Sequence, residues 1–327
     1  DPLAPDPIVI DSHHRGLVDH GRPVSATDVG IRSLVRHVDG GDPVHTHSLA
    51  MTDRVLADGL ARHLDRAKSK LTPHSGRVER GLVDPTNRPL SPTALEDYAA
   101  CPRKYLFGRV LRLGVAEAPE RIEEISPRDR GTLVHLILEK FVGEAIGAGT
   151  VPEPGADWSS SQVERLLELL DISVKDSADL GITGGRVQTE ILRRQLRGEA
   201  LNFVELDNQL RADHGSTPVA VEHEFGFDEA NPLILTVDGR HLKIRGVVDR
   251  VDLTDDGGLL VIDYKGGSAG PFRGMESDPL KGGTRLQLPL YARVLADEFE
   301  RTGPRHALYW LTKHNSLLPL ELDLSLI

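Results

Sequence analysis

The stretch GVVDRVDLTDDGGLLVIDYKG, residues 246–266, is the most informative part of this chain for its fold. Two β-rich runs flank residues 255–258, and Asp-Gly sequences of this kind form tight turns between antiparallel strands. If the loop has three residues, Thr254 pairs with Gly258 and Asp249 lies opposite Asp263. A four-residue loop would shift the register by one residue and turn Asp249 to the other face of the sheet.

The first register also places an amine beside the two carboxylates, because Lys265 lies two residues beyond Asp263 and shares its face. Paired aspartates are hard oxygen ligands suited to Mg²⁺ or Mn²⁺. A divalent ion activates water and shields charge at a phosphodiester, and Lys265 would orient that water or stabilise the developing charge. The alternative is a solvated strand face with a surface ion pair, although Asp249 and Asp263 follow apolar runs in which an unpaired carboxylate is costly.

Composition sets the wider limits. The chain has 327 residues, is 39% hydrophobic and carries a formal charge of −11. Its length suits one large domain with an appendage, or two domains. The negative charge excludes a protein that holds nucleic acid by bulk charge, but it leaves room for a local basic track. We find no membrane-length apolar run and no signal-peptide pattern, and we therefore expect a cytoplasmic protein.

The order of elements predicts a mixed fold. Residues 1–88 are irregular except for a helix expected over residues 49–70, and residues 84–89 read as a linker. Helices are then expected over residues 91–100, 103–113, 126–141, 159–170, 186–213 and 285–301. Strands are expected over residues 219–227, 233–237, 242–253, 259–264, 306–313 and 317–322. Helices first and a mostly antiparallel sheet afterwards predict an α+β or mixed α/β fold, with a central mixed sheet flanked by helices.

Four ordered motifs resemble the PD-(D/E)XK nuclease superfamily in its RecB/AddB-like branch. The first is LSPTALEDYAACPRKY, residues 90–105, and the second is RGTLVHLILE, residues 130–139. The aspartate–lysine hairpin is the third, and QLPLY, residues 287–291, is the fourth. The resemblance covers about residues 90–295 and implies a restriction-endonuclease-like core. It divides the chain into residues 1–88, the tail of a preceding helicase-like domain, and a C-terminally incomplete nuclease domain over residues 89–327.

The resemblance also implies a metal site. It makes His135 a ligand together with Asp249, Asp263 and the backbone carbonyl of Tyr264, with Asp249, Asp263 and Lys265 as the catalytic group. Taken alone, a histidine in an apolar helix is more often a core residue. Glu222 or Glu224, on the strand before the hairpin, is a further acidic candidate, although a surface or structural position is the more common outcome for such residues.

Other residues are expected to support DNA binding. Gln287 and Tyr291 share one helix face, and the resemblance implies that they hold the strand near the site; alternatively, Tyr291 packs in the core. Arg103, Lys104 and Arg130 are candidates for a local basic track, although most such clusters are solvated faces.

Cys101, the single cysteine, matches a position that binds a [4Fe–4S] cluster in AddB-like proteins. One cysteine cannot hold such a cluster, so residues beyond 327 would have to supply further cysteines. Otherwise Cys101 is a small buried residue.

We therefore expect a metal-dependent DNA nuclease domain, exonucleolytic rather than endonucleolytic. The resemblance implies a role in recombinational repair of double-strand breaks, with a helicase-type partner and a single strand threaded to the site. The competing hypothesis is a non-catalytic DNA-binding or scaffold module that keeps the fold. Because the chain begins with Asp, we expect a fragment of a longer protein or a processed product.

Overall fold

The computed structural model describes residues 25–66, 72, 77, 88–114, 123–227, 233–275 and 277–320. The chain divides into two compact units, residues 1–83 and residues 84–327. No helix in the described part is long and apolar enough to cross a membrane.

Most of the described residues of the first unit are helical. It contains α2 (Ala26–Asp39), a 3₁₀ turn (Val44–Thr46), α3 (Ser48–Thr52) and α4 (Arg54–Arg66). The sequence did not lead us to expect α2, although Ser25 and Asp28 form a capping box at its start. The helix expected over residues 49–70 is interrupted at Asp53, whose carboxylate accepts the backbone N–H of Leu56 at 3.0 Å. Residues 67–70 of that prediction lie outside the described residues.

Three helices of the second unit begin at a serine cap. Ser91, Ser126 and Ser159 each accept a backbone N–H three residues on. The helices are α5 (Pro92–Ala100), α6 (Pro102–Tyr105), a π turn (Leu106–Val110), α7 (Pro127–Ala148), α8 (Ser160–Asp179), α9 (Arg186–His214) and α10 (Gln287–Glu298). The single helix expected over residues 103–113 is thus a short helix followed by a π turn.

A five-stranded mixed sheet forms the centre of this unit, in the order β1-β4-β5-β6-β7. Its strands are β1 (Ser216–Phe225), β4 (Gly246–Thr254), β5 (Leu259–Lys265), β6 (Arg305–Leu311) and β7 (Ser316–Leu320). Only β5 and β6 pair in parallel among the described strands, and α10 connects them. A separate hairpin joins β2 (Leu233–Val237) to β3 (Arg240–Ile244), so the strand expected over residues 242–253 is divided at Arg245.

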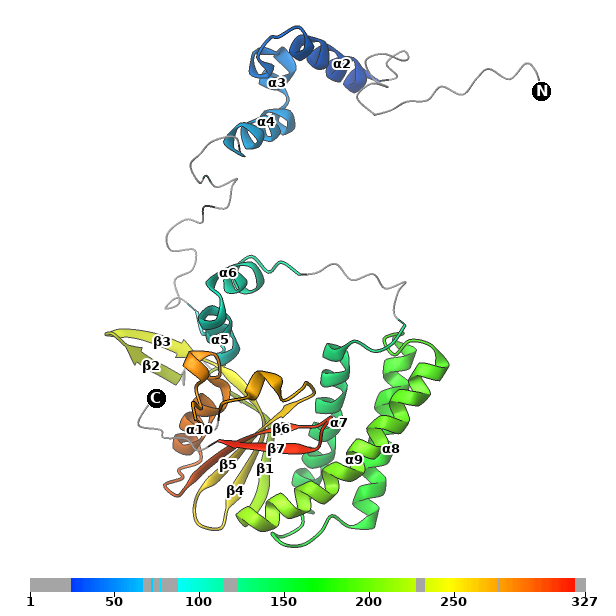
Figure 1. Cartoon of the computed structure of the whole chain (residues 1–327), viewed down its shortest axis with the longest axis vertical. Coiled ribbons are helices and arrows are strands. Elements are labelled where there is room, and N and C mark those ends of the chain that lie inside the picture. The colour runs from blue at the N-terminus through cyan, green and yellow to red at the C-terminus, as the bar shows by residue number, and fades with distance from the viewer. Residues whose placement is uncertain are drawn as a thin grey trace, which may run out of the picture. The chain divides into compact units, whose positions relative to one another are not determined.

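Both faces of the sheet are covered (Figure 1): α7, α8 and α9 lie on one side and α10 on the other. Alternate residues of β5 enter the two cores, with Leu260 and Ile262 facing α7–α9 and Leu259 and Val261 facing α10. Strands that are buried on both faces have uninterrupted apolar sequences, which explains why the residues of β5 before Asp263 are all apolar. The expected sheet flanked by helices is confirmed.

A buried ionic network joins α9 to β4 next to the predicted site. Arg250 donates through Nε and Nη2 to Asp252, at 2.6 and 2.7 Å, and through Nη1 to Asp207. Asp207 also accepts from Arg211 at 3.0 Å and from the indole of Trp158 at 2.7 Å. Charges removed from water are tolerated only when they are paired in this way. The network therefore fixes the position of Arg250, which directly follows Asp249 on β4.

Candidate active site

The hairpin has the register that places Asp249 opposite Asp263. Arg250 pairs with Ile262 and Val251 with Val261, and the same offset aligns Asp249 with Asp263. The three-residue loop is confirmed, because Thr254 N–H donates to the Gly258 carbonyl at 3.3 Å. Gly257 has a φ of +82°, the left-handed conformation that glycine adopts without strain. The four-residue alternative is wrong.

Asp249 lies where β4 and β5 end their pairing, beside helix α7. Its Oδ2 accepts the backbone N–H of Tyr264 at 2.6 Å and lies 3.6 Å from Nδ1 of His135. Nε2 of His135 donates to the Tyr264 carbonyl at 2.9 Å. When this imidazole is neutral, Nδ1 carries a lone pair that faces the carboxylate. Two electron-rich atoms at this separation suit a shared cation.

Glu222 completes this cluster from the neighbouring strand. Among the described residues, His135, Glu222 and Asp249 form the one group of three metal-ligand side chains whose ligand atoms lie within 4.8 Å of one another. Glu222 lies between the pairs Val221–Arg250 and His223–Val248, so it is aligned with Asp249. Its φ is +43°, a strained value for a side chain other than glycine. Glu224 is exposed and lies outside the group.

The electrostatics of the cluster favour a cation. Burial raises the pKa of Asp249 well above its usual value, and the nearby Asp263 raises it further. Burial also raises the pKa of Glu222, with added repulsion from Glu139 and Asp263. The same burial lowers the pKa of His135, which keeps the imidazole neutral as a ligand must be. An imidazole with two carboxylates is a donor set that divalent cations accept.

Asp263 and Lys265 form an ion pair beside this cluster. Lys265 Nζ lies 2.6 Å from Asp263 Oδ2, and the two side chains are 28% and 2% exposed. Burial alone would lower the pKa of Lys265, but Asp263 and Asp249 outweigh it and the pKa is raised. The amine is therefore a charged donor. The ligand atoms of Asp263 do not join the group formed by His135, Glu222 and Asp249.

Gln287 and Tyr291 lie one turn apart at the start of α10, as expected. Gln287 Oε1 accepts from Lys265 Nζ at 3.0 Å, and its Nε2 donates to the Tyr291 hydroxyl at 3.3 Å. Tyr291 is buried in the core with Leu288 and Leu295 and packs edge-on against Phe225. Gln287 thus contacts the amine directly, and Tyr291 supports it from the core.

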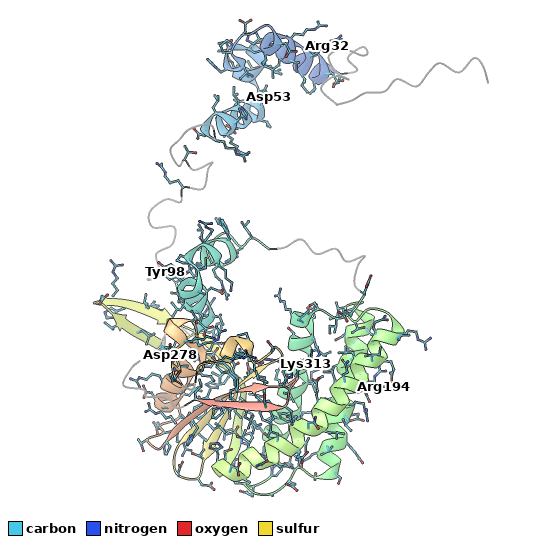
Figure 2. The ribbon with its side chains drawn as sticks, viewed as in Figure 1. Arg32, Asp53, Tyr98, Arg194, Asp278 and Lys313 are labelled. Atoms are coloured by element: carbon cyan, nitrogen blue, oxygen red, sulfur yellow. The ribbon has the colours of Figure 1, made fainter. Side chains whose placement is uncertain are left out.

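An open groove of about 570 Å³ runs past His135, Glu222 and Lys265. His135, Glu139, Glu222, Lys265 and the exposed Arg128 are among the residues that line it. A second groove, of about 530 Å³, shares Pro127 and Gly266 with the first. Lys313, labelled in Figure 2, lines this second groove from the turn between β6 and β7. Because they share Pro127 and Gly266, the two grooves adjoin each other.

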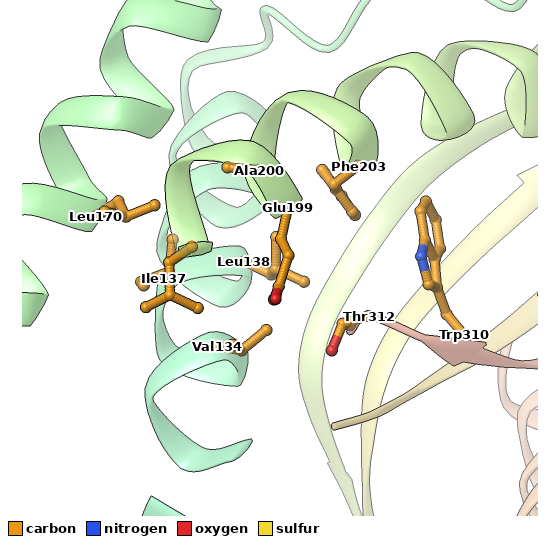
Figure 3. Close-up of a pocket in the computed structure, with 10 residues that line it drawn as sticks. Val134, Ile137, Leu138, Leu170, Glu199, Ala200, Phe203, Trp310 and Thr312 are labelled. Atoms are coloured by element: carbon orange, nitrogen blue, oxygen red, sulfur yellow. The ribbon is translucent and has the colours of Figure 1, made fainter. Parts of the chain in front are cut away.

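A third space is much smaller than these two grooves. Figure 3 shows a cavity between α7, α8, α9 and β6, where Glu199 lies among apolar side chains. Its volume is about 30 Å³, which suits a single water molecule.

The predicted basic residues are only partly available. Arg130 is 12% exposed and its guanidinium pairs with Glu199. Lys104 lies 2.6 Å from Asp97, which also pairs with Arg109 at 2.8 Å. Arg103 is exposed on α6. These residues are therefore not all free for phosphate, and Arg128, beside the first groove, is better placed than Arg130.

Cys101 is exposed, so its interpretation as a small buried residue is wrong. It precedes α6, where the backbone N–H groups of Lys104 and Arg103 lower the pKa of its thiol. An accessible thiol with a lowered pKa suits a metal ligand.

Comparison with known proteins gives a consistent family assignment. A family model described as the PD-(D/E)XK nuclease superfamily matches residues 89–320, more than half of the chain. Those residues contain α5, the whole described sheet and the side chains of the metal-ligand cluster, Lys265 and Gln287.

The chain is also similar to one subunit, designated B, of ATP-dependent helicase/deoxyribonucleases. The protein from Acetivibrio thermocellus is 28% identical over 232 residues, which are 67% of this chain and 19% of that protein. The protein from Ruminiclostridium cellulolyticum is 27% identical over 216 residues, 64% of this chain and 18% of that protein. The protein from Clostridioides difficile is 25% identical over 233 residues, which are 67% of this chain and 19% of that protein. The matched part spans about a fifth of these relatives.

Proposed function

Because this chain belongs to the PD-(D/E)XK nuclease superfamily, we propose that its second unit hydrolyses DNA phosphodiester bonds with Mg²⁺ or Mn²⁺ as cofactor. One observation carries the proposal. His135 and Glu222, which form a potential metal-ligand cluster with Asp249, line the same groove as Lys265. Metal ligands and a charged donor within one groove are what a metal-dependent attack on a phosphodiester needs.

The donor set fits a hard divalent ion. Asp249, Glu222 and the Tyr264 carbonyl offer oxygen, and neutral His135 offers nitrogen. Asp263, aligned with Asp249, is the further carboxylate that we propose as a ligand. Such an ion would lower the pKa of a bound water molecule and neutralise charge at the scissile phosphate.

The chain's own residues then have separate tasks. Lys265 keeps its proton at Nζ and donates to the phosphate oxygen on which charge develops. Gln287 Oε1, 3.0 Å from Nζ, limits the orientations of the amine. Tyr291 supports Gln287 from the core. Arg128, with Arg103 and Lys104 on α6, supplies positive charge for the approach of a strand to an acidic protein.

The relatives support a wider setting. Their names describe one subunit of an ATP-dependent helicase/deoxyribonuclease, so we propose that this chain is the nuclease part of a subunit of that kind, acting on a single strand delivered by a helicase-type partner. Residues 1–88 would end the preceding helicase-like part. We also propose exonucleolytic cleavage, a cytoplasmic location and a role in double-strand-break repair. A [4Fe–4S] cluster at Cys101 would require cysteines from beyond residue 327.

The test is cleavage of end-labelled linear and circular single-stranded DNA by the 327-residue chain with Mg²⁺, Mn²⁺ or EDTA. We expect metal-dependent degradation of the linear strand and loss of activity in Asp263→Ala and Lys265→Ala. Equal cleavage by these variants would refute the site. DNA binding without any cleavage by the wild type would favour the scaffold hypothesis.

A further inference from the structure

Helix α10 begins without a cap from its own sequence. Its N-cap residue is Leu286, whose aliphatic side chain cannot accept a hydrogen bond. The first N–H groups of a helix have no partner within the helix and need one elsewhere. The preceding segment is hydrogen-bonded within itself up to Arg285, whose N–H donates to the Leu280 carbonyl at 3.1 Å, and so it leaves the N–H groups of Leu286 and Gln287 to another partner. The position of the first turn of α10 must therefore be fixed from outside.

Glu96, on α5, supplies that partner across the fold. Its Oε1 accepts the backbone N–H of Leu286 at 2.6 Å and that of Gln287 at 3.0 Å. A carboxylate at a helix N-terminus also interacts favourably with the helix dipole. Burial raises the pKa of Glu96 above its usual value, and the two backbone N–H groups, Arg285 and Lys265 offset only part of this rise. The side chain is thus partly buried and committed to α10.

The capped turn is the one that reaches the candidate active site. Gln287 is the first residue of α10, and its Oε1 accepts from Lys265 Nζ at 3.0 Å. Lys265 in turn lies 2.6 Å from Asp263. Two contacts therefore connect α5 to the amine, Glu96 to the Gln287 backbone and the Gln287 side chain to Lys265, and a third connects the amine to Asp263.

Two other roles for Glu96 fit less well. It lies outside the group formed by His135, Glu222 and Asp249, so metal binding does not explain it. A carboxylate would repel DNA phosphates, so strand binding does not explain it either. Within the described part of the chain, the hydrogen bonds of its carboxylate go to the start of α10.

We propose that Glu96 is a positioning residue, which caps α10 and thereby holds the Gln287 side chain against Lys265. This inference rests on the proposed nuclease function for its catalytic consequence, but the cap itself can be measured without any activity.

The first measurement is hydrogen exchange at the start of α10 in the metal-free 327-residue chain. In Glu96→Ala we expect the amides of Leu286 and Gln287 to exchange about tenfold faster, the usual effect of losing a cap. Glu96→Gln keeps an oxygen in place and should stay within about threefold of the wild type. Glu164→Ala, at an exposed position of α8, is the control. Unchanged exchange at Leu286 and Gln287 in Glu96→Ala would overturn the proposal.

The second measurement is a double-mutant cycle on cleavage. We expect Glu96→Ala to lower kcat about tenfold with little change in KM, and Glu96→Gln to restore most of it. If Glu96 acts through Gln287, the double variant with Gln287→Ala should be no slower than Gln287→Ala alone. Multiplying losses would overturn the proposal. A wild type that fails to cleave, with exchange still dependent on Glu96, would refute the nuclease function and leave the cap standing.

Discussion

Replacing Lys265 by methionine should move metal affinity and catalysis in opposite directions. Methionine keeps an unbranched side chain and removes the ammonium that lies 2.6 Å from Asp263. In the wild type this positive charge competes with a divalent ion for the carboxylates. Without it, Asp263 is left 2% exposed with no nearby ammonium, and the free protein should lose about 2 to 3 kcal/mol of stability.

The magnitudes follow from that geometry. Two unit charges about 4 Å apart near a protein surface interact by about 4 kcal/mol. Lys265 is 28% exposed, and solvent screening reduces this value. A third of it still corresponds to about tenfold tighter metal binding. Cleavage should nevertheless fall by about 10²- to 10³-fold, as when a charged or polar donor to a developing oxyanion is lost.

Two assays test this prediction together. Calorimetric titration with Mn²⁺ in the absence of DNA gives the affinity, and single-turnover cleavage at saturating metal gives the rate. Lys175→Met, an exposed lysine of α8, is the matched control. Weaker Mn²⁺ binding would show that Lys265 supports the metal site, and unchanged cleavage would show that it has no catalytic role; either result refutes the reasoning.

Three further predictions concern the carboxylates. Because burial and Asp263 raise the pKa of Asp249 above its unfolded value, ionisation of Asp249 should cost the protein in EDTA stability as pH rises above about 4. Asp249→Asn should remove that loss and therefore raise the midpoint of thermal unfolding in EDTA at pH 8. The variant's midpoint should no longer rise when Mg²⁺ is added. A variant midpoint in EDTA below that of the wild type would contradict this prediction. Glu222→Gln should weaken Mn²⁺ binding about 10- to 100-fold by calorimetry, whereas Glu224→Gln, at an exposed position, should not; equal effects would exclude Glu222 as a ligand. Asp207→Asn should lower the free energy of unfolding in urea by about 3 to 5 kcal/mol, compared with less than about 0.5 kcal/mol for the exposed Asp213→Asn; a small loss would mean that the network around Arg250 contributes little.

The sequence alone determined the features that depend on neighbouring residues. The Asp-Gly turn predicts a hairpin between the two strands, and a loop of three residues would align Asp249 with Asp263; the hydrogen bond between Thr254 and Gly258 in the structure shows that the loop has this length. In the same way, helix periodicity places Gln287 and Tyr291 on one face, and Ser-Pro pairs mark the starts of α5 and α7. Backbone geometry and hydrogen bonds over a few residues decide the turn, the helix face and the helix starts, so the local sequence is sufficient for these features.

Only the tertiary structure decided which distant side chains meet. Glu222 lies next to Asp249 because β1 pairs with β4. Arg130 forms an ion pair with Glu199, which lies 69 residues further along the chain. Glu96 meets the start of α10, 190 residues away, because α5 packs there. Such contacts depend on how whole helices and strands pack together. No pattern within a single segment carries that information, since the same local sequence is compatible with many packings.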